Sequence, residues 1–274
     1  MVRRDRYVLF GHPVSHSWSP FIHGLFARQL GHEIDYQLRD VAPEAFRMAA
    51  LEFFAGGGSG ANITVPHKLA AAELANSLTP RAERAGAVNT LAFRGDDGLL
   101  GDNTDGAGLV ADLRRNLGVA LAGSRILLLG AGGAVRGVLG PLLAEGPSRV
   151  LIANRTAARA TELATAFTDL GPVEGGSFAA AGSSGWDLVI NATSAGLGGA
   201  LPDLPSSAIR ADSVCYDMSY SRSATPFQQW AGAQGAIRTH QGWGMLVEQA
   251  AESYLLWRGV RPDTVPVLAA LARL

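Results

Sequence analysis

Lysine is almost absent from this 274-residue chain. One of its 23 basic side chains is lysine, Lys68, and all the others are arginine. An arginine guanidinium stays protonated in proteins, whereas a lysine ammonium can lose its proton when it is buried or placed among charges. Lys68 is therefore a candidate acid or base, although a composition biased towards arginine would also leave few lysines.

Cysteine is equally rare, and the histidines form no ligand pattern. Cys215 is the one cysteine, so the chain can form neither an internal disulfide nor a multi-cysteine metal site. The six histidines are scattered and include no His-Glu-x-x-His motif, so we predict no metal site. A single thiol fits a reducing compartment, and we expect the protein to act in the cytoplasm.

Long apolar runs and an excess of charge are missing as well. No uninterrupted apolar run approaches the roughly 20 residues of a membrane span, and the apolar segment 7–10 is too short for a signal peptide. Apolar residues make up 47% of the chain and charged residues 17%, with a net charge of -1. This composition predicts a globular protein without a membrane or nucleic-acid partner. The oligomeric state stays open, and a homodimer is compatible with the sequence.

Strands and helices alternate along the first half of the chain. We expect Ser19 to cap a helix that begins with Pro20 and stops at Gly31, because these residue types are typical of helix ends. The turn 95–98 should join the two strands of a hairpin. The other predicted elements are strands at 7–10, 34–38 and 61–65, a helix at 43–54, a helix that follows the third strand and extends through 74, hairpin strands at 90–94 and 99–100, and a helix at about 105–117.

The second half repeats this alternation. A continuous apolar strand at 125–129, a helix at 133–144 and a strand at 149–153 form one βαβ unit with a glycine-rich first turn. Segments 171–185 and 196–205 are rich in glycine, alanine, serine and proline, and they are predicted to be loops. The remaining predicted elements are helices at 156–167, 226–233, 243–257 and 264–274, and strands at 188–191, 214–217 and 236–239.

The glycine-rich turn has the context of a dinucleotide-binding motif. It follows an apolar strand and opens a helix, so its backbone could approach a pyrophosphate that the helix N-terminus favours. A strict G-x-G-x-x-G motif would have glycine where Val135 stands, and Gly133 and Gly137 occur instead. The alternative is a tight turn that binds nothing. The predicted cofactor-binding residues of this turn are Gly130, Ala131, Gly132, Gly133 and Ala134.

The end of the next strand indicates which dinucleotide is bound. An NAD site usually places an acidic residue there for the ribose hydroxyl, but this chain has no acid until Glu162. Arg155 and Arg159 could instead hold a 2′-phosphate through charge-assisted hydrogen bonds, with Asn154 and Thr156 as neutral donors. We therefore predict NADP as the cofactor, the alternative being that both arginines are only solvated charges.

Three polar clusters lie at predicted strand ends or helix starts in the first half: 15–20, 62–68 and 101–106. Their hydroxyls, amides and carboxylates suit a small polyhydroxy carboxylate, because each substrate oxygen needs a partner once water is excluded. Each cluster taken singly could also be a local cap or turn.

Taken in order, these segments resemble the shikimate dehydrogenase family. The resemblance spans nearly the whole chain, and no single motif decides it. It implies NADPH-dependent, reversible reduction of 3-dehydroshikimate to shikimate, a step of aromatic amino-acid biosynthesis. The segments that carry the resemblance are 11–20, 60–68, 85–90, 101–106, 130–137, 154–156, 191–194, 216–218 and 242–250.

The resemblance also implies roles for individual residues. Lys68 and Asp105 would form the catalytic pair, and the motif Asn-Thr-Asp-Gly selects Asp105 over its neighbour Asp102, which the residues alone do not. The implied substrate ligands are Ser17 and Ser19 for the carboxylate, Thr64, Asn89, Asp105 and Gln249 for the hydroxyls, Tyr220 at the pocket edge and Asn62 at its floor. Met218 and Gly242 are added to the predicted cofactor ligands.

Three other functions remain as alternatives. A quinate/shikimate dehydrogenase that uses NAD is disfavoured by the missing ribose acid. A non-catalytic NADP-binding regulatory module would need neither Lys68 nor the three polar clusters. An amino-acid dehydrogenase would need a carboxylate for the substrate ammonium, and we can place none.

The predicted fold is α/β with two domains. Residues 1–104 should form an α/β substrate-binding domain, to which the C-terminal helices of 240–274 return. Residues 105–239 should form a doubly wound Rossmann domain that binds NADP.

Overall fold

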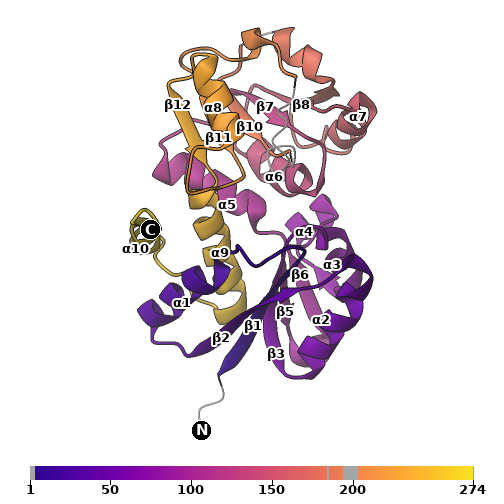
Figure 1. Ribbon diagram of the computed structural model, residues 1–274. Helices are drawn as coiled ribbons and strands as arrows, with labels where there is room; N and C mark the ends of the chain where they lie inside the picture. Colours follow the sequence, from indigo (N-terminus) through magenta and orange to yellow (C-terminus); the bar gives the residue numbers. More distant parts are fainter. Residues whose placement is uncertain (1–3, 184, 194–202, 274) are drawn as a thin grey trace. The chain divides into compact units, whose positions relative to one another are not determined.

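The computed structural model describes residues 4–183, 185–193 and 203–273. The chain divides into two compact units (Figure 1): unit 1 is Met1–Gly108 with Leu246–Leu274, and unit 2 is Leu109–Met245. Both boundaries lie a few residues beyond the predicted ones. Each unit is built around its own six-stranded sheet, which confirms the predicted α/β class.

Unit 1 contains a mixed sheet with the strand order β2-β1-β3-β5-β6-β4. β1 pairs in parallel with β2 and β3, whereas β5 runs antiparallel to both β3 and β6. The elements are β1 (Asp5–Gly11), α1 (Ser19–Leu30), β2 (Ile34–Asp40), α2 (Phe46–Ala55), β3 (Gly58–Ile63), α3 (Lys68–Leu74), β4 (Ser77–Leu78), α4 (Pro80–Ala85), β5 (Thr90–Phe93) and β6 (Leu99–Asp102), followed at the end of the chain by α9 (Trp243–Arg258) and α10 (Val265–Leu271).

Helices cover both faces of this sheet. Successive side chains of a strand point to opposite faces, so Val8 and Phe10 of β1 pack in one apolar cluster with α2 and α3. Tyr7 points to the other face and stacks on Trp257 of α9, with 4.5 Å between the ring centroids. A separate cluster joins α1, α9 and α10 on that side. The C-terminal helices thus complete the core of unit 1.

The start of α1 corrects one local prediction. The helix begins at Ser19, its N-cap position is Trp18, and no side chain caps it there. The Ser17 hydroxyl instead accepts a hydrogen bond from the Ser19 amide at 3.2 Å. Gly31 ends the helix in the left-handed conformation, with φ 66°, as predicted. The helix expected at 43–54 begins with a 3₁₀ turn, Pro43–Ala45, before α2.

Unit 2 contains an entirely parallel sheet with the order β12-β11-β10-β7-β8-β9, which is the doubly wound Rossmann arrangement. α5 begins in unit 1 and ends in unit 2, whereas α9 begins in unit 2 and ends in unit 1. The elements are α5 (Asp105–Ala111), β7 (Arg125–Leu129), α6 (Gly133–Ala144), β8 (Arg149–Ala153), α7 (Ala157–Thr165), β9 (Val173–Gly176), β10 (Leu188–Asn191), β11 (Val214–Asp217), α8 (Pro226–Ala233) and β12 (Arg238–Gln241).

The two faces of this sheet bury alternate residues of the same strands. Ile126 and Leu128 of β7 join one cluster with α6 and α7, and Leu127 and Leu129 join a second cluster with α8. Strands buried on both faces read as continuous apolar runs, which explains why β7 and β8 occur at the predicted positions. In the described part of the chain, no helix is both long and apolar enough to span a membrane.

Two predictions for unit 2 are wrong in detail. Residues Val173–Gly176 form the edge strand β9 within the segment expected to be a loop, 171–185. The helix predicted at 105–117 is α-helical only to Ala111 and continues as one π-helical stretch, Asp112–Asn116. Most of the second predicted loop, 196–205, lies outside the described residues.

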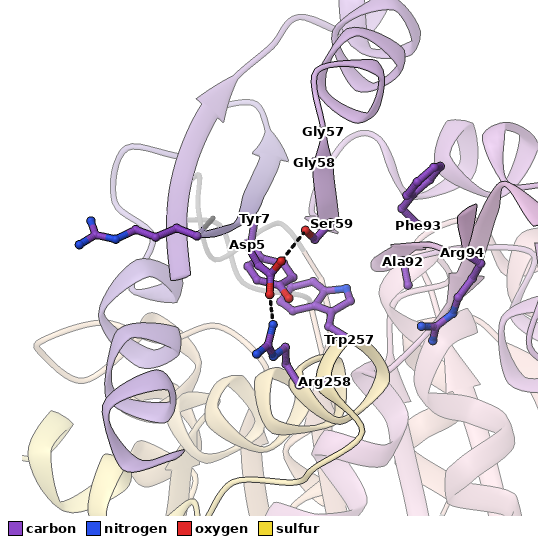
Figure 2. A pocket seen from close by; sticks show the side chains of 11 residues that line it. Asp5, Tyr7, Gly57, Gly58, Ser59, Ala92, Phe93, Arg94, Trp257 and Arg258 are labelled. Carbon is purple, nitrogen blue, oxygen red and sulfur yellow. Dashed lines mark hydrogen bonds and ion pairs between the residues drawn. The ribbon is translucent and has the colours of Figure 1, made fainter. Parts of the chain in front are cut away.

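A hollow opens at the amino end of β1 in unit 1 (Figure 2). Asp5 lies at its centre, where it pairs with Arg258 and accepts a 3.5 Å hydrogen bond from Ser59. None of the predicted site residues lines this hollow. Ser17, Ser19, Thr64 and Lys68 instead follow the opposite, carboxyl ends of β1 and β3.

Candidate active site

Lys68 and Asp105 form an ion pair in unit 1. Each is the first residue of a helix, Lys68 of α3 after β3 and Asp105 of α5 after β6. β3 and β6 point the same way, because the antiparallel β5 separates them, so both helices start at one edge of the sheet. The side chains are 16% and 8% exposed, which leaves the pair accessible to a small ligand.

Asn89 lies at the same edge, because it directly precedes the antiparallel strand β5. Its amide nitrogen donates to Asp105 Oδ1 at 2.7 Å and to Thr104 Oγ1 at 2.9 Å. Its amide oxygen accepts from the Thr104 backbone N–H at 2.8 Å and from the Thr90 hydroxyl at 2.9 Å. These bonds fix the orientation of the Asn89 amide group. In this orientation one amide N–H points at the Asp105 carboxylate.

The geometry separates Asp105 from Asp102. Asp102 is 1% exposed and accepts two bonds from Arg81, at 2.7 and 2.5 Å, and one from Thr79 at 2.6 Å. Burial alone would raise the pKa of Asp102, but the hydrogen bonds and charge of Arg81 and the bond from Thr79 hold it below its usual value. Asp102 is therefore a structural anion, and Asp105 is the carboxylate that pairs with the lysine.

The two predicted carboxylate ligands lie in a second part of the same unit. The Ser17 hydroxyl donates to Ser19 Oγ at 3.1 Å. Ser19 also lies close enough to Tyr36 to oppose the rise in the Tyr36 pKa that burial causes. The Tyr36 hydroxyl donates to Asn62 Oδ1 at 2.7 Å. Tyr36 therefore contacts Asn62 directly and lies near Ser19.

Asn62 continues this network towards Asn89. Its amide nitrogen donates to Ser253 Oγ at 3.0 Å and to Thr90 Oγ1 at 3.3 Å, and Thr90 bonds Asn89. Hydrogen-bonded side chains thus connect Tyr36, through Asn62, Thr90 and Asn89, with Asp105 inside unit 1.

Gln249 of α9 is brought to the pair, and Thr64 follows the end of β3. Gln249 Oε1 accepts from Asn89 Nδ2 at 3.3 Å. A Cβ on Gly108 would come within 2.6 Å of Gln249 Cβ, so glycine allows α5 to pack closely on α9. Thr64 is half-buried. Its predicted role as a ligand of a substrate hydroxyl stays a prediction.

Four residues of this network were not predicted from sequence: Tyr36, Thr90, Thr104 and Ser253. Thr90 and Thr104 adjoin predicted ligands and could have been included. Ser253 lies one helical turn after Gln249, a spacing that places both on one helix face. Tyr36 lies in an ordinary strand pattern and carries no sequence signal of its role.

His23 is a buried imidazole beside this network. It is fully buried and stacks on Tyr36, with 4.5 Å between the ring centroids and 12° between the planes. Burial lowers the pKa of His23 to about 3, and a weaker contribution from Asn62 opposes the shift. The imidazole is therefore neutral throughout the working range of most enzymes.

We expect His23 to make the protein less stable in acid. Because the pKa is lower in the folded than in the unfolded state, the unfolded state binds the extra proton as the pH falls below about 6.5. The free energy of unfolding should decrease from about pH 6.5 to about pH 3, by on the order of 4 kcal/mol from this residue. Urea unfolding of wild type and of His23→Leu at several pH values measures this loss. If the free energy of unfolding fell equally steeply with pH in both proteins, the prediction would be contradicted.

In unit 2 the predicted cofactor residues gather at the carboxyl ends of the parallel strands. Gly130 follows β7 with φ 110°, a conformation that favours glycine, and its amide donates to Ala153 O at 2.8 Å. A Cβ on Gly132 or Gly133 would meet no atom within 4 Å, so the N-terminus of α6 is open. Ala131 and Ala134 are half-buried beside them, and Gly137 is buried on α6.

Arg155 and Arg159 follow the next strand, β8, and both are exposed. Neither guanidinium pairs with a carboxylate among the residues that the structure describes. The Asn154 side chain bonds the Thr156 carbonyl at 3.0 Å and shapes the turn before α7. The segment after β8 thus presents two arginine side chains, and, as predicted, no acidic residue stands at the end of the strand.

Met218, Tyr220 and Gly242 also lie in unit 2. Met218 follows β11, and its carbonyl oxygen would be 2.4 Å from a Cβ on Gly242. The Tyr220 ring contacts Trp243, with 4.6 Å between the centroids. Tyr220 therefore belongs to a different unit from the other predicted substrate ligands.

Comparison with known proteins decides the family. Three family models match in order: the shikimate dehydrogenase substrate binding domain over residues 9–91, shikimate/quinate 5-dehydrogenase over 112–196, and the shikimate 5'-dehydrogenase C-terminal domain over 242–272. The shikimate dehydrogenase (NADP(+)) of Aeromonas hydrophila is 58% identical over 269 residues, which are 98% of this chain and 98% of that protein. The chain belongs to the shikimate dehydrogenase family.

Solved structures agree with membership of the shikimate dehydrogenase family. The crystal structure of an enzyme from Pseudomonas putida is 44% identical, with a TM-score of 0.91, and the match covers 97% of this chain and 98% of that one. The shikimate 5-dehydrogenase from Thermus thermophilus, solved in complex with NADP(H) and shikimate, is 33% identical, with a TM-score of 0.86 and coverage of 98% and 99%.

Proposed function

We propose that this protein is an NADP-dependent oxidoreductase that interconverts 3-dehydroshikimate and shikimate. The observation that carries the proposal is the Lys68–Asp105 pair, held at one sheet edge among amide and hydroxyl groups, in a chain of this family. A lysine beside a carboxylate can accept the proton of a secondary alcohol during oxidation and donate one during reduction.

Lys68 would move the proton. In the reduction its ammonium donates a proton from Nζ to the substrate carbonyl oxygen as that oxygen becomes a hydroxyl, and in the reverse direction Nζ accepts it. Asp105 holds the ammonium in place through one carboxylate oxygen, while the other accepts from Asn89. NADPH, when bound, supplies the hydride for this reduction.

Asn89, Gln249 and Thr64 would bind the ring hydroxyls, and Ser17 and Ser19 the carboxylate, with Asn62 beneath the ring and Tyr220 at its edge. Supporting this, the hydrogen-bond network has already fixed the orientation of the Asn89 and Asn62 amides. Side chains that are already held in place lose little conformational entropy when a ligand binds.

The chain around Gly130 fits a dinucleotide phosphate. Its open helix N-terminus can hold the pyrophosphate, and Arg155 and Arg159 are free of carboxylates among the described residues and can hold the 2′-phosphate. Asn154, Thr156, Met218 and Gly242 would complete the cofactor site. Use of NAD by a quinate/shikimate dehydrogenase is disfavoured by the same two arginines.

A spectrophotometric assay tests the proposed function. Purified protein mixed with shikimate and NADP should produce reduced nicotinamide, followed by its absorbance, with a much lower rate when NAD replaces NADP. Quinate in place of shikimate tests the substrate. No reduction with any of these pairs would reject the proposal, and faster reduction with NAD would reject the cofactor assignment.

The two serines give a second test, which separates substrate from cofactor. Ser17→Ala and Ser19→Ala should each raise the KM for shikimate roughly 5- to 100-fold, because each removes a hydrogen bond to a charged carboxylate. The KM for NADP should stay within about twofold, since the serines and the cofactor residues belong to different units. Weakened NADP binding with normal shikimate binding would show that the carboxylate site is misplaced.

We also propose that the protein works in the cytoplasm and has no nucleic-acid partner. A net charge of -1 offers no attraction for polyanions, and the single thiol suits a reducing compartment. A homodimer stays a proposal that sedimentation at micromolar concentration would test.

A further inference from the structure

Thr90 places a buried hydroxyl between two of the proposed substrate ligands. It is the first residue of β5 and lies opposite Asn62 of β3 in the antiparallel pair, where side chains of opposite residues share one face of the sheet. Its neighbour in the chain is Asn89. Thr90 is 0% exposed, so it is placed to act through these neighbours and not on a ligand directly.

The Thr90 hydroxyl uses its whole hydrogen-bonding capacity, which is one proton and two lone pairs. The Asn62 amide nitrogen donates to Thr90 Oγ1 at 3.3 Å. The Asn89 amide oxygen lies 2.9 Å from the hydroxyl and the Ser253 hydroxyl 2.8 Å from it. An amide oxygen can only accept, whereas Ser253 has a proton of its own. The Thr90 proton therefore goes to Asn89, and Ser253 donates to Thr90.

The hydrogen bonds on both sides of Thr90 run in one direction. The Tyr36 hydroxyl donates to the Asn62 oxygen at 2.7 Å, and the Asn62 nitrogen donates to Thr90. Thr90 donates to the Asn89 oxygen, and the Asn89 nitrogen donates to Asp105 Oδ1 at 2.7 Å. If the Asn89 amide were turned over, its oxygen would face the Asp105 carboxylate, and two acceptors would oppose each other.

Removal of the Thr90 hydroxyl would weaken this arrangement without abolishing it. The Asn89 oxygen would still accept from the Thr104 backbone N–H at 2.8 Å. It would lose the bond from Thr90, and the buried Asn62 nitrogen would lose one of its acceptors. A buried polar group that loses a partner is costly, so both amides would become free to shift.

We propose that Thr90 is a positioning residue for the reaction, whose hydroxyl holds the Asn89 amide against Asp105 and in the orientation that binds a substrate hydroxyl. This inference rests on the proposed function. The role belongs to the hydroxyl and not to the shape of the side chain. Valine has nearly the same shape without the hydroxyl, and serine keeps the hydroxyl without the methyl group, so the two substitutions separate these properties.

Steady-state kinetics of Thr90→Val and Thr90→Ser test the inference. Thr90→Val should lower kcat/KM for shikimate roughly tenfold, which corresponds to the loss of one buried hydrogen bond. Thr90→Ser should stay within about threefold of wild type, because it keeps the hydroxyl. The KM for NADP should change less than about twofold in both variants, since Thr90 and its partners belong to unit 1 and the proposed cofactor residues to unit 2.

Tyr254→Phe is the matched control for the loss of a buried hydroxyl. Tyr254 also belongs to unit 1, is 1% exposed, and bonds His32 at 2.9 Å. This bond is not part of the chain of bonds that leads to Asp105. Tyr254→Phe should therefore leave kcat/KM for shikimate unchanged, although it removes a buried hydrogen bond as Thr90→Val does.

Three results would overturn the proposal: unchanged kcat/KM for shikimate in Thr90→Val, an equal loss in Thr90→Ser, or an equal loss in Tyr254→Phe. The first would show that the hydroxyl is not needed, and the other two that any disturbance of the core has the same effect. If Thr90→Val fails to fold by circular dichroism, Thr90→Cys, which replaces the hydroxyl with a weak donor, gives the decision. Wild type that turns over no shikimate would instead reject the proposed function.

Discussion

Replacing Lys68 with alanine or methionine is expected to lower kcat by roughly 10²- to 10⁴-fold, the usual contribution of a general acid or base. The KM for shikimate should change much less, because Asn89 and the other ligands keep their positions. The value of kcat falls because the alcohol proton then has no positioned group to receive it. Initial rates with shikimate and NADP, measured across a range of both substrates, give the two constants.

Lys68→Arg distinguishes proton transfer from a purely electrostatic role. Arginine keeps the positive charge next to Asp105 but cannot release a proton. A large loss of kcat in a folded variant that still binds NADP supports proton transfer, whereas near wild-type kcat would refute the role of Lys68. Asp105→Asn tests the carboxylate separately: it keeps Lys68 and its proton but removes the anion beside it, and it should reduce kcat less than Lys68→Met.

The second large effect concerns the cofactor. Changing both Arg155 and Arg159 to glutamine should raise the KM for NADP roughly 10²- to 10⁴-fold, since each charge-assisted bond to phosphate contributes about 1.5 to 3 kcal/mol. The KM for NAD should hardly change, because NAD has no 2′-phosphate. The ratio of kcat/KM for the two cofactors is the quantity to measure.

Arg114→Gln is the matched control for this experiment. Arg114 is also an exposed arginine of unit 2, but it pairs with Glu145. Its loss should leave the preference for NADP intact. An unaltered preference in the double variant would show that the 2′-phosphate is held elsewhere.

The parts of the fold that could be predicted are those in which burial leaves a simple pattern. β7, α6 and β8 have the predicted bounds, because strands covered on both faces must be apolar throughout and glycines mark their ends. β9 was missed since its sequence, Val-Glu-Gly-Gly, is typical of a turn. The structure explains the glycine: a Cβ on Gly175 would come within 2.2 Å of the Ala160 backbone, so α7 could not pack there.

The site was predictable where residues adjoin in sequence and unpredictable where they meet across the fold. Lys68 and Asp105 stand out in polar clusters, Asn89 was implied by the family resemblance, and the three do come together. From sequence, the choice between Asp102 and Asp105 needed the family resemblance. The ion pair between Arg81 and Asp102, which separates the two carboxylates, is visible only in the fold. Tyr36 reaches Asn62 from another strand, a contact that no local pattern indicates.

The β5–β6 turn offers a place to modify this enzyme. Residues 93–97 are exposed, and Gly95 and Gly98 have φ of 63° and 77°. Because β5 runs antiparallel, this turn lies at the edge of the sheet away from Asn89, Lys68 and Asp105. Exposed turn tips tolerate insertions best. A reporter domain inserted between Asp96 and Asp97, or new chain ends made there by circular permutation, should therefore leave the chemistry intact and yield a genetically encodable tag for following the enzyme in cells.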